Sequence, residues 1–324
     1  MKIIALMPVK NEEWILPTTL EDLSRYIDDL VVCDGSDEDN SRVVIKKYGG
    51  HLISESKTLD YSLWRSELLK KGRELGGTHF IWLDADESFT NNFHTNYIKI
   101  LKSLKPGQAV TMEWICLWKS VFKQRFDNSI WVKSYKDFIF CDDQISDFKT
   151  KVIHESRTPV IINNENLIKL SPKFGAVLHF QFVPFLRFQE KQAYMRCREL
   201  LISNREAPAI NKDYSITNDN NKINTINVPR TWISDFQNLE KIEALGNNHY
   251  YLKKIFNYFS EFGVEKFEPL DIWHIDALKD FFVNSLGRNP QPKLYAPSLR
   301  EKISYFKAST IKAIKKYSDI KSYY

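Results

Sequence analysis

Three acidic residues follow a short apolar run near residue 80, and they have the types and spacing needed for chemistry. Phe80–Leu83 is apolar, and Asp84, Asp86 and Glu87 come directly after it. This pattern predicts a buried strand that delivers carboxylates to the edge of a sheet, although it also fits a solvated acidic turn. Because Asp84 and Asp86 are two positions apart, both can reach one cation. Two hard oxygen donors suit Mg²⁺ or Mn²⁺, which proteins often hold together with substrate phosphates.

Two earlier apolar runs end in polar loops in the same way. Lys2–Pro8 predicts a first strand, followed by Asn11 and Glu12, and Leu30–Cys33 predicts a second strand, followed by Asp34. Between these runs, apolar residues recur at helical spacing. Alternating strands and helices predict an α/β fold with a doubly wound, mainly parallel sheet. Ligands of such sheets bind beyond the carboxyl ends of the strands, so the three polar loops are expected to meet there.

The elements between these loops have recognisable ends. Asn11 is a candidate N-cap for a helix reaching residue 27, and Ser41 for a helix reaching residue 48. A third strand is predicted at 51–54 and a third helix at about 60–75, closed by Gly76 and Gly77.

The loop motifs resemble those of inverting family 2 glycosyltransferases of GT-A fold. The matching motifs are Pro-Val-x-Asn-Glu, Val-Val-x-Asp-Gly-Ser and Leu-Asp-Ala-Asp-Glu, in the family's order and spacing. The resemblance implies a nucleotide-sugar donor, a divalent metal on Asp84 and Asp86, and a phosphate-facing Arg65 in the helix before them. The donor-binding residues that it implies are Pro8, Asn11, Glu12, Asp34, Arg65 and Asp84.

The chemistry of sugar transfer is consistent with these residues. A departing diphosphate accumulates negative charge, which a metal and a guanidinium neutralise where it develops. An arginine fork fits phosphate better than a lysine. Each residue also has a structural alternative. Glu12 and Glu13 fit the first turn of a helix, Asp34 fits simple turn chemistry, and Arg65 fits a solvated helix surface.

Two later motifs extend the resemblance. His154-Glu155 and a second histidine, His179, are similar to the "His-Glu … His" pair of family 2 enzymes that glucosylate the inner core of bacterial lipopolysaccharide. An inverting transferase needs a base for the acceptor hydroxyl, and Glu155 is the candidate, with Asp142 and Asp143 as rivals. The resemblance makes His179 a third metal ligand, while its apolar flanks also fit a core histidine.

The length of 324 residues predicts one large α/β domain with an appendage, and 43% hydrophobic residues exclude wholesale disorder. We expect a transferase domain at 1–207, with a nucleotide-sugar half at about 1–115 and an acceptor half at about 116–207. A linker and helical extension fill 208–324, with a flexible segment at 211–227 and helices at 250–262 and 272–286. Aromatic residues of the acceptor half offer either sugar-stacking surfaces or core, namely Trp114, Trp118, Phe122, Phe126, Trp131 and Tyr135.

Charge is concentrated at the end of the chain. The net charge is +5, and the segment from Gln291 alone carries eight Lys or Arg and two acids. The rest of the chain is therefore nearly balanced, which gives no support to a nucleic-acid groove. The tail from about Leu299 to Tyr317 has the apolar stripe and lysines of an interfacial helix, and the same stripe also fits packing on the main domain.

Four scattered cysteines without metal spacing indicate a reducing compartment, and no run approaches the roughly 20 apolar residues of a membrane span. We therefore expect a cytoplasmic protein with peripheral contact to an anionic membrane. The predicted function is metal-assisted transfer of a hexose, with inversion, from a nucleoside diphosphate sugar to a glycan or glycolipid. The alternatives are a non-catalytic nucleotide- or glycan-binding relative and a sugar nucleotidyltransferase, which would want a Gly-rich loop that residues 8–12 lack.

Overall fold

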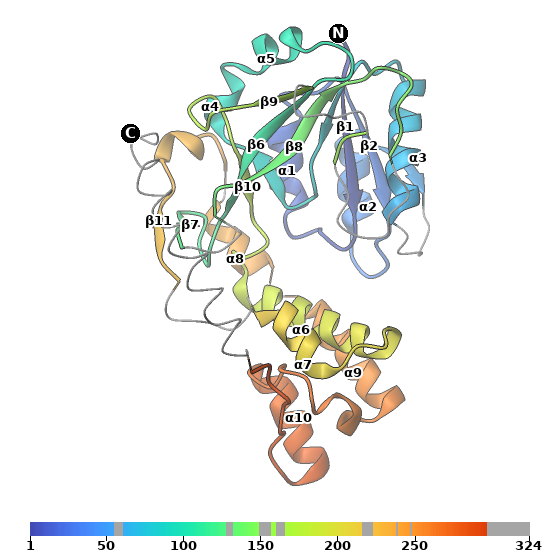
Figure 1. The fold of residues 1–324 in the computed structure, drawn as a ribbon, viewed down its shortest axis with the longest axis vertical. Coiled ribbons are helices and arrows are strands. Elements are labelled where there is room, and N and C mark those ends of the chain that lie inside the picture. Colours follow the sequence, from blue (N-terminus) through green and yellow to red (C-terminus); the bar gives the residue numbers. More distant parts are fainter. Residues whose placement is uncertain are drawn as a thin grey trace. The chain divides into compact units, whose positions relative to one another are not determined.

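The structure is a computed structural model that describes residues 1–54, 61–127, 132–148, 157–159, 166–215, 223–237, 239–246 and 248–296. The chain forms two compact units (Figure 1). The first unit contains Met1–Val183 together with Thr225–Leu245, and the second contains Pro184–Asn224 together with the chain from Gly246.

A mixed sheet forms the centre of the first unit. Its strand order is β3-β2-β1-β4-β8-β6-β10-β5, and β9 pairs with β6. Strands β1 to β4 are parallel to one another, whereas β8 and β5 are antiparallel to their neighbours. The predicted α/β class with a mainly parallel sheet is confirmed. The strands are β1 (Ile3–Val9), β2 (Asp29–Asp34), β3 (His51–Ser54), β4 (His79–Trp82), β5 (Glu87–Phe89), β6 (Ala109–Cys116), β8 (Ser134–Cys141), β9 (Leu167–Lys169) and β10 (Val177–His179).

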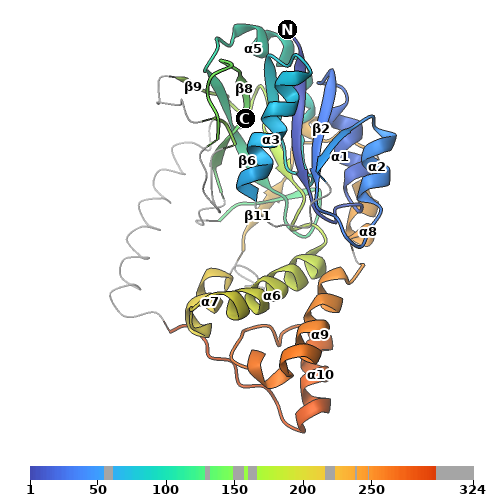
Figure 2. The ribbon, with the colours of Figure 1, turned by 90° about the vertical axis from the view of Figure 1, so that its right-hand side faces the viewer.

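Helices cover both faces of the parallel strands. On one face Trp64 and Leu68 of α3 pack with Ile4 and Leu6 of β1, while α1 and α2 lie on the opposite face (Figure 2). Strands buried on both faces read as continuous apolar runs, which is why β1 and β2 were easy to predict. The helices of this unit are α1 (Leu16–Leu23), α2 (Ser41–Lys47), α3 (Tyr61–Glu74), α4 (Asn91–His94), α5 (Tyr97–Ser103) and α8 (Ile242–Leu245).

The ends of two helices can be compared with the sequence predictions. The prediction that Asn11 caps the first helix is wrong, because α1 begins at Leu16 and Asn11 has a left-handed backbone with φ of 55°. Glu12 and Glu13 therefore precede the helix rather than occupy its first turn. The α3 helix ends before Gly76, whose φ of 79° favours glycine, as predicted.

The second unit is helical. Ala193 and Cys197 of α6 share a core with Ile255 and Phe259 of α9. The α9 helix has the predicted bounds, whereas α10 begins four residues later than predicted. The helices are α6 (Phe185–Ile202), α7 (Ala207–Asp213), α9 (Tyr250–Phe262) and α10 (Asp276–Leu286).

The division between the units differs from the sequence-based ranges. The sequence predicts that residues 185–202 belong to the transferase domain, but α6 packs with the later helices. Conversely, part of the predicted linker returns to the first unit, because β11 (Thr225–Asn227) pairs with β7 (Lys123–Arg125) and Trp232 shares a core with Trp14. The segment predicted as flexible at 211–227 thus contains the end of α7 and a strand.

None of the described helices is long and apolar enough to span a bilayer. The predicted tail helix at about 299–317 lies outside the described residues.

Candidate functional site

The register of the sheet brings the three polar loops to one edge. Val9 of β1 is paired with Asp34 of β2, and Leu6 of β1 with Trp82 of β4. Because these strands are parallel, the loops that follow them all leave from their carboxyl ends. The edge therefore holds residues from three separate motifs.

The first loop is joined to the second through Asn11. Its buried side chain donates to Asp37 Oδ1 at 2.9 Å and accepts from the backbone N–H of Asp37 at 3.1 Å. Its own backbone N–H donates to Ser36 Oγ at 2.8 Å. The left-handed backbone of Asn11 thus serves a cross-loop contact.

Glu12 and Pro8 lie beside this contact. The backbone N–H of Glu12 donates to Ser41 Oγ at 3.0 Å, and the Glu12 carboxylate accepts from the indole of Trp14. Pro8 lies within β1, paired with Cys33 of β2. The two loops form one hydrogen-bonded platform.

Asp34 is fully buried at the end of β2. Its Oδ1 accepts from the backbone N–H of Ser36 at 2.9 Å, and its Oδ2 accepts from Arg42 Nε at 3.1 Å. The carboxylate therefore shapes the turn, as the structural alternative proposed, while remaining at the predicted edge.

The third loop is organised by Glu87, which is completely buried. Its carboxylate accepts from the backbone N–H of Asp84 at 2.9 Å, from Trp114 Nε1 at 2.6 Å, and from Arg157 at 2.6 and 2.9 Å. Arg157 also donates to Asp84 Oδ2 at 2.6 Å. One guanidinium is thus shared by two carboxylates.

The two carboxylates respond differently to this environment. Burial acts to raise the pKa of Glu87, but Arg157 outweighs it and holds that pKa below its usual value. Burial raises the pKa of Asp84, supported by the negative charges of Glu87 and Asp86 and opposed by Arg157. Because 42% of the Asp84 side chain is exposed, water moderates that rise. Glu87 is therefore the firmly ionised partner of Arg157.

Asp86 lies beside His179, the second histidine of the predicted "His-Glu … His" pair. Its Oδ2 lies 3.3 Å from Nε2 of His179, whose ring stacks on Trp114 with centroids 4.3 Å apart. Nδ1 of His179 is buried and has no hydrogen-bond partner among the described residues. On the other side of Trp114, Lys136 Nζ lies 3.2 Å from the ring centroid.

Within the described part of the chain, no set of three or more His, Cys, Asp and Glu side chains is arranged to hold a metal ion. Two carboxylates, one of them exposed, still match the donor set that Mg²⁺ and Mn²⁺ use when phosphate and water complete the shell. Asp84 and Asp86 therefore fit such an ion, with His179 next to Asp86.

Arg65 lies on α3, and its guanidinium carbon is 5.9 Å from the centroid of the Trp82 ring. Trp82 ends β4, two residues before Asp84. Arg65 thus belongs to the α3 side of the same edge.

The alternative bases Asp142 and Asp143 lie at the opposite edge of the sheet. His79 of β4 is paired with Cys141 of the antiparallel β8, so Asp142 lies beside the amino end of β4. Asp84 leaves the carboxyl end of that strand. With a rise of about 3.3 Å per residue, the strand separates the two positions by roughly 10 Å or more.

Both carboxylates also have structural partners there. Arg73 donates to the two oxygens of Asp142, each at 2.8 Å. Burial acts to raise the pKa of Asp143, but hydrogen bonds from the backbone N–H groups of Ser146 and Ile145 outweigh it and lower the pKa. A carboxylate whose pKa is lowered is a weak base, which disfavours Asp143 as the base, and neither Asp142 nor Asp143 lies near Asp84. Glu155 lies outside the described residues.

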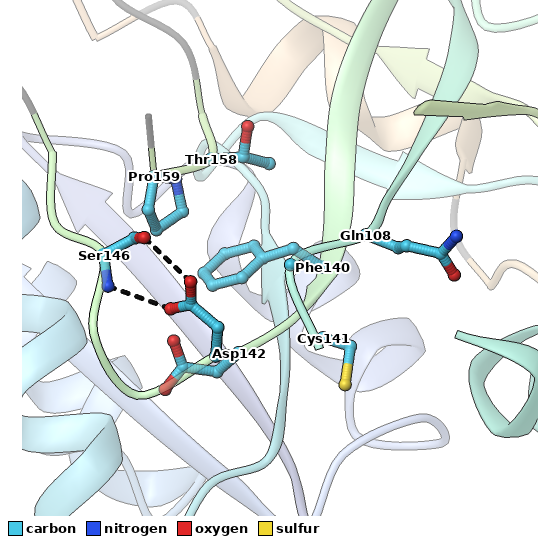
Figure 3. A pocket seen from close by; sticks show the side chains of 9 residues that line it. Gln108, Phe140, Cys141, Asp142, Ser146, Thr158 and Pro159 are labelled. Atoms are coloured by element: carbon cyan, nitrogen blue, oxygen red, sulfur yellow. Dashed lines mark hydrogen bonds between the residues drawn. The ribbon is translucent and has the colours of Figure 1, made fainter. Parts of the chain in front are cut away.

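A small pocket with a cavity volume of about 10 Å³ lies beside Asp142, lined also by Phe140, Cys141, Thr158 and Pro159 (Figure 3). Sites for drug-sized ligands usually measure about 300–1,000 Å³. This pocket is therefore too small for a sugar nucleotide.

The aromatic residues of the acceptor half differ in burial, and Phe126 and Tyr135 are partly exposed. Trp114 and Trp118 are buried, and the latter faces Phe182 and Arg125. Phe122 is 51% exposed. Trp131 lies outside the described residues.

Sequence reasoning missed Arg157 and Lys136 and did not foresee the central position of Glu87. Glu87 follows Asp84 and Asp86 directly, so its position was a usable signal. Arg157 comes two residues after Glu155, so the His154-Glu155 motif was a usable signal, whereas Lys136 stands in no motif and is brought to the edge by the long-range pairing of β8 with β6.

No family model and no curated protein matches the sequence. Among solved structures, residues 1–349 of S. aureus TarS are 13% identical over 86% of this chain and 83% of that chain, with a TM-score of 0.38. Glucosyl-3-phosphoglycerate synthase from Mycobacterium tuberculosis, solved with Mn²⁺, UDP and glucosyl-3-phosphoglycerate, is 19% identical over 36% of this chain and 44% of that chain, with a TM-score of 0.25. Mannosyl-3-phosphoglycerate synthase from Rubrobacter xylanophilus is 17% identical over 37% and 41%, with a TM-score of 0.27.

This chain spans less than half the length of the two synthases and about half of the longer TarS structure. At TM-scores below 0.5 these similarities assign no function to this chain.

Proposed function

We propose that the chain is a GT-A glycosyltransferase, similar to family 2, that transfers a hexose with inversion from a UDP-sugar to a glycan or glycolipid. One observation carries the proposal. The loops after β1, β2 and β4 meet at one sheet edge, with Asp84 and Asp86 beside an arginine. Ligands of open α/β sheets bind at this edge. The pair His154-Glu155 and His179 favours a lipopolysaccharide-like acceptor.

In this proposal Pro8, Asn11, Glu12 and Asp34 bind the nucleotide. The hydrogen bonds of Asn11 and Asp34 to the turn after β2 support the assignment, because they fix the loops before a ligand arrives. Preorganised loops lose less conformational entropy on binding.

Asp84 and Asp86 are the residues that would hold Mn²⁺ or Mg²⁺, with His179 next to them. Such an ion, when bound, offsets the negative charge of a leaving diphosphate. Arg65 adds a guanidinium on the α3 side. Glu155 takes the proton of the acceptor hydroxyl as this oxygen attacks the anomeric carbon and the bond to the diphosphate breaks on the other face.

The test is a screen of purified protein against a panel of sugar nucleotides, measuring hydrolysis and transfer with and without Mn²⁺. We expect turnover with one donor, dependent on the ion, and nearly complete loss in Asp86→Asn. The matched control is Asp143→Asn, at the far edge of the sheet, which should keep wild-type turnover.

The outcomes separate the alternatives. Nucleotide binding without turnover would indicate a non-catalytic relative, and formation of a sugar nucleotide from a sugar phosphate would indicate a nucleotidyltransferase. Full activity of Asp86→Asn in chelator-treated buffer would overturn the metal assignment. The basic tail is proposed to bring the enzyme to an anionic membrane, which co-sedimentation with anionic liposomes tests.

A further inference from the structure

Arg157 makes two unequal contacts beside the Asp84–Asp86 turn. Two of its hydrogen bonds go to Glu87, at 2.6 and 2.9 Å, and one goes to Asp84, at 2.6 Å. Glu87 is fully buried, whereas 42% of the Asp84 side chain is exposed. The two halves of the contact therefore differ in what it costs to break them.

Separating Arg157 from Glu87 would leave a buried carboxylate without its cation, which is strongly unfavourable. Separating it from Asp84 costs less, because 42% of the Asp84 side chain is exposed and water can solvate that carboxylate. Glu87 is further fixed by the indole of Trp114 and the backbone N–H of Asp84. Arg157 therefore keeps its hydrogen bonds to Glu87, whereas its hydrogen bond to Asp84 can be replaced by one to another ligand.

The guanidinium has capacity for a further ligand. Arginine carries five N–H donors, and within the described residues Arg157 uses three of them, all on Glu87 and Asp84. Phe138 lies against the guanidinium, whose carbon is 4.8 Å from the ring centroid. The guanidinium keeps N–H donors that are unused within the described residues, and 11% of the Arg157 side chain is exposed, which suits two-bond binding of a phosphate.

We propose that Arg157 binds the diphosphate of the donor and exchanges Asp84 for phosphate when nucleotide and divalent cation arrive together. This inference rests on the proposed function and adds to it a residue and an order of events. Without nucleotide, Arg157 competes with the cation for Asp84. When nucleotide is bound, the phosphates accept hydrogen bonds from Arg157, and Asp84 is then able to bind the cation. The two ligands therefore strengthen each other's binding, by the same factor in either order.

The test measures two affinities of the full chain by titration calorimetry, Mn²⁺ alone and UDP at saturating Mn²⁺. In Arg157→Met we expect the affinity for Mn²⁺ alone to rise, by about 5-fold or more, because the competitor is gone. The affinity for UDP should fall about 10–100-fold, the usual worth of charged hydrogen bonds. Opposite signs are the diagnostic result, since damage to the fold would lower both.

Two further variants sharpen the result. Arg157→Lys keeps the charge and loses the fork, so its UDP affinity should fall between those of wild type and Arg157→Met. The matched control is Arg73→Met. It removes a guanidinium that also donates two hydrogen bonds to one carboxylate, that of Asp142, at the opposite edge of the sheet. It should leave both affinities unchanged.

The outcomes also separate this inference from the proposed function. If wild type binds UDP and Arg157→Met binds it equally well, or loses both affinities together, the inference is wrong and the proposed function stands. If wild-type protein binds no nucleoside diphosphate with Mn²⁺, both are wrong.

Discussion

The two ends of strand β4 each hold an arginine that grips a buried carboxylate with two hydrogen bonds. At the amino end Arg73 binds Asp142, and its Nη2 also donates to the carbonyl oxygen of Ser146 at 2.6 Å. At the carboxyl end Arg157 binds Glu87 and also donates to Asp84. The same pair chemistry thus occurs in two settings.

The difference lies in the third partner. At the amino end it is a main-chain carbonyl, so every ligand of Arg73 is part of the fold. At the carboxyl end it is a second, partly exposed carboxylate, which water can solvate when Arg157 leaves it. A buried ion pair is therefore a poor sign of function by itself. The exposed, replaceable partner is what distinguishes a candidate site from a structural clamp.

The largest expected effect comes from removing the buried carboxylate at each end. Glu87→Gln leaves Arg157 short of a countercharge and weakens the contacts to Trp114 and the turn, so we expect a loss of about 3–5 kcal/mol in the free energy of unfolding. Asp142→Asn should cost less, about 1.5–3 kcal/mol, because Arg73 is partly exposed and can be hydrated. Urea unfolding measures both.

Nucleotide binding separates the pair further. Glu87→Gln should weaken UDP binding, since Arg157 and the Asp84 loop lose their anchor, whereas Asp142→Asn should not. Equal losses of UDP affinity in the two variants would remove the distinction between the ends of β4.

The carboxyl end could be predicted from sequence because its parts are local. An apolar strand followed by a polar loop is read from neighbouring residues, and the parallel order of the strands then places Asp34, Asp84 and Asn11 together. The contacts made by an individual loop residue were harder to predict from the sequence. Asn11 has the composition of an N-cap, but its contacts to the turn after β2 override that preference.

The other half of the sheet could not be predicted in this way. Residues 119–151 show no clear period, yet they contain β8, whose place is fixed by antiparallel pairing with both β4 and β6. Pairing across such distances depends on the whole fold and leaves only a weak local pattern. The same long-range pairing brings Lys136 to the site and places Asp142 at the wrong edge for a base.

Asp22 is a buried carboxylate that, unlike Glu87 and Asp142, does not accept two hydrogen bonds from an arginine. Asp22 of α1 accepts from Ser88 Oγ at 2.9 Å, and Arg25 is 3.7 Å away. Burial raises the pKa of Asp22 to about 7 from 3.8. The folded protein therefore binds more protons than the unfolded chain between these values, so the free energy of unfolding should fall as the pH rises through this window.

The loss should be on the order of 3–4 kcal/mol between pH 4 and pH 8. Asp22→Asn should remove this pH dependence and be more stable than wild type at pH 8. Glu21→Gln, an exposed position on the same helix, is the control and should keep the wild-type profile in urea unfolding. A flat wild-type profile between pH 4 and pH 8 would show that burial does not raise the pKa of Asp22.

The smallest expected effect concerns two lysines that sit on aromatic rings on opposite faces of the sheet. Lys136 Nζ is 3.2 Å from the centroid of Trp114, and Lys169 Nζ is 3.8 Å from that of Tyr135. Lys136 and Tyr135 are adjacent in β8, so their side chains point to opposite faces. Glu87 and His179 lie on the face of Lys136, because they are paired across β5 and β10 and His179 stacks on Trp114.

The variants Lys136→Met and Lys169→Met each lose a similar cation–π contact, worth about 0.5–2 kcal/mol, so the free energy of unfolding should change by a similar amount in both. Lys136→Met should in addition weaken UDP binding about 5- to 10-fold, because a positive charge near the phosphates is lost, whereas Lys169→Met should not. Calorimetric titration of UDP at saturating Mn²⁺ decides, and an equal loss in both variants would mean that the overall charge of the protein, rather than the face beside Glu87, attracts the nucleotide.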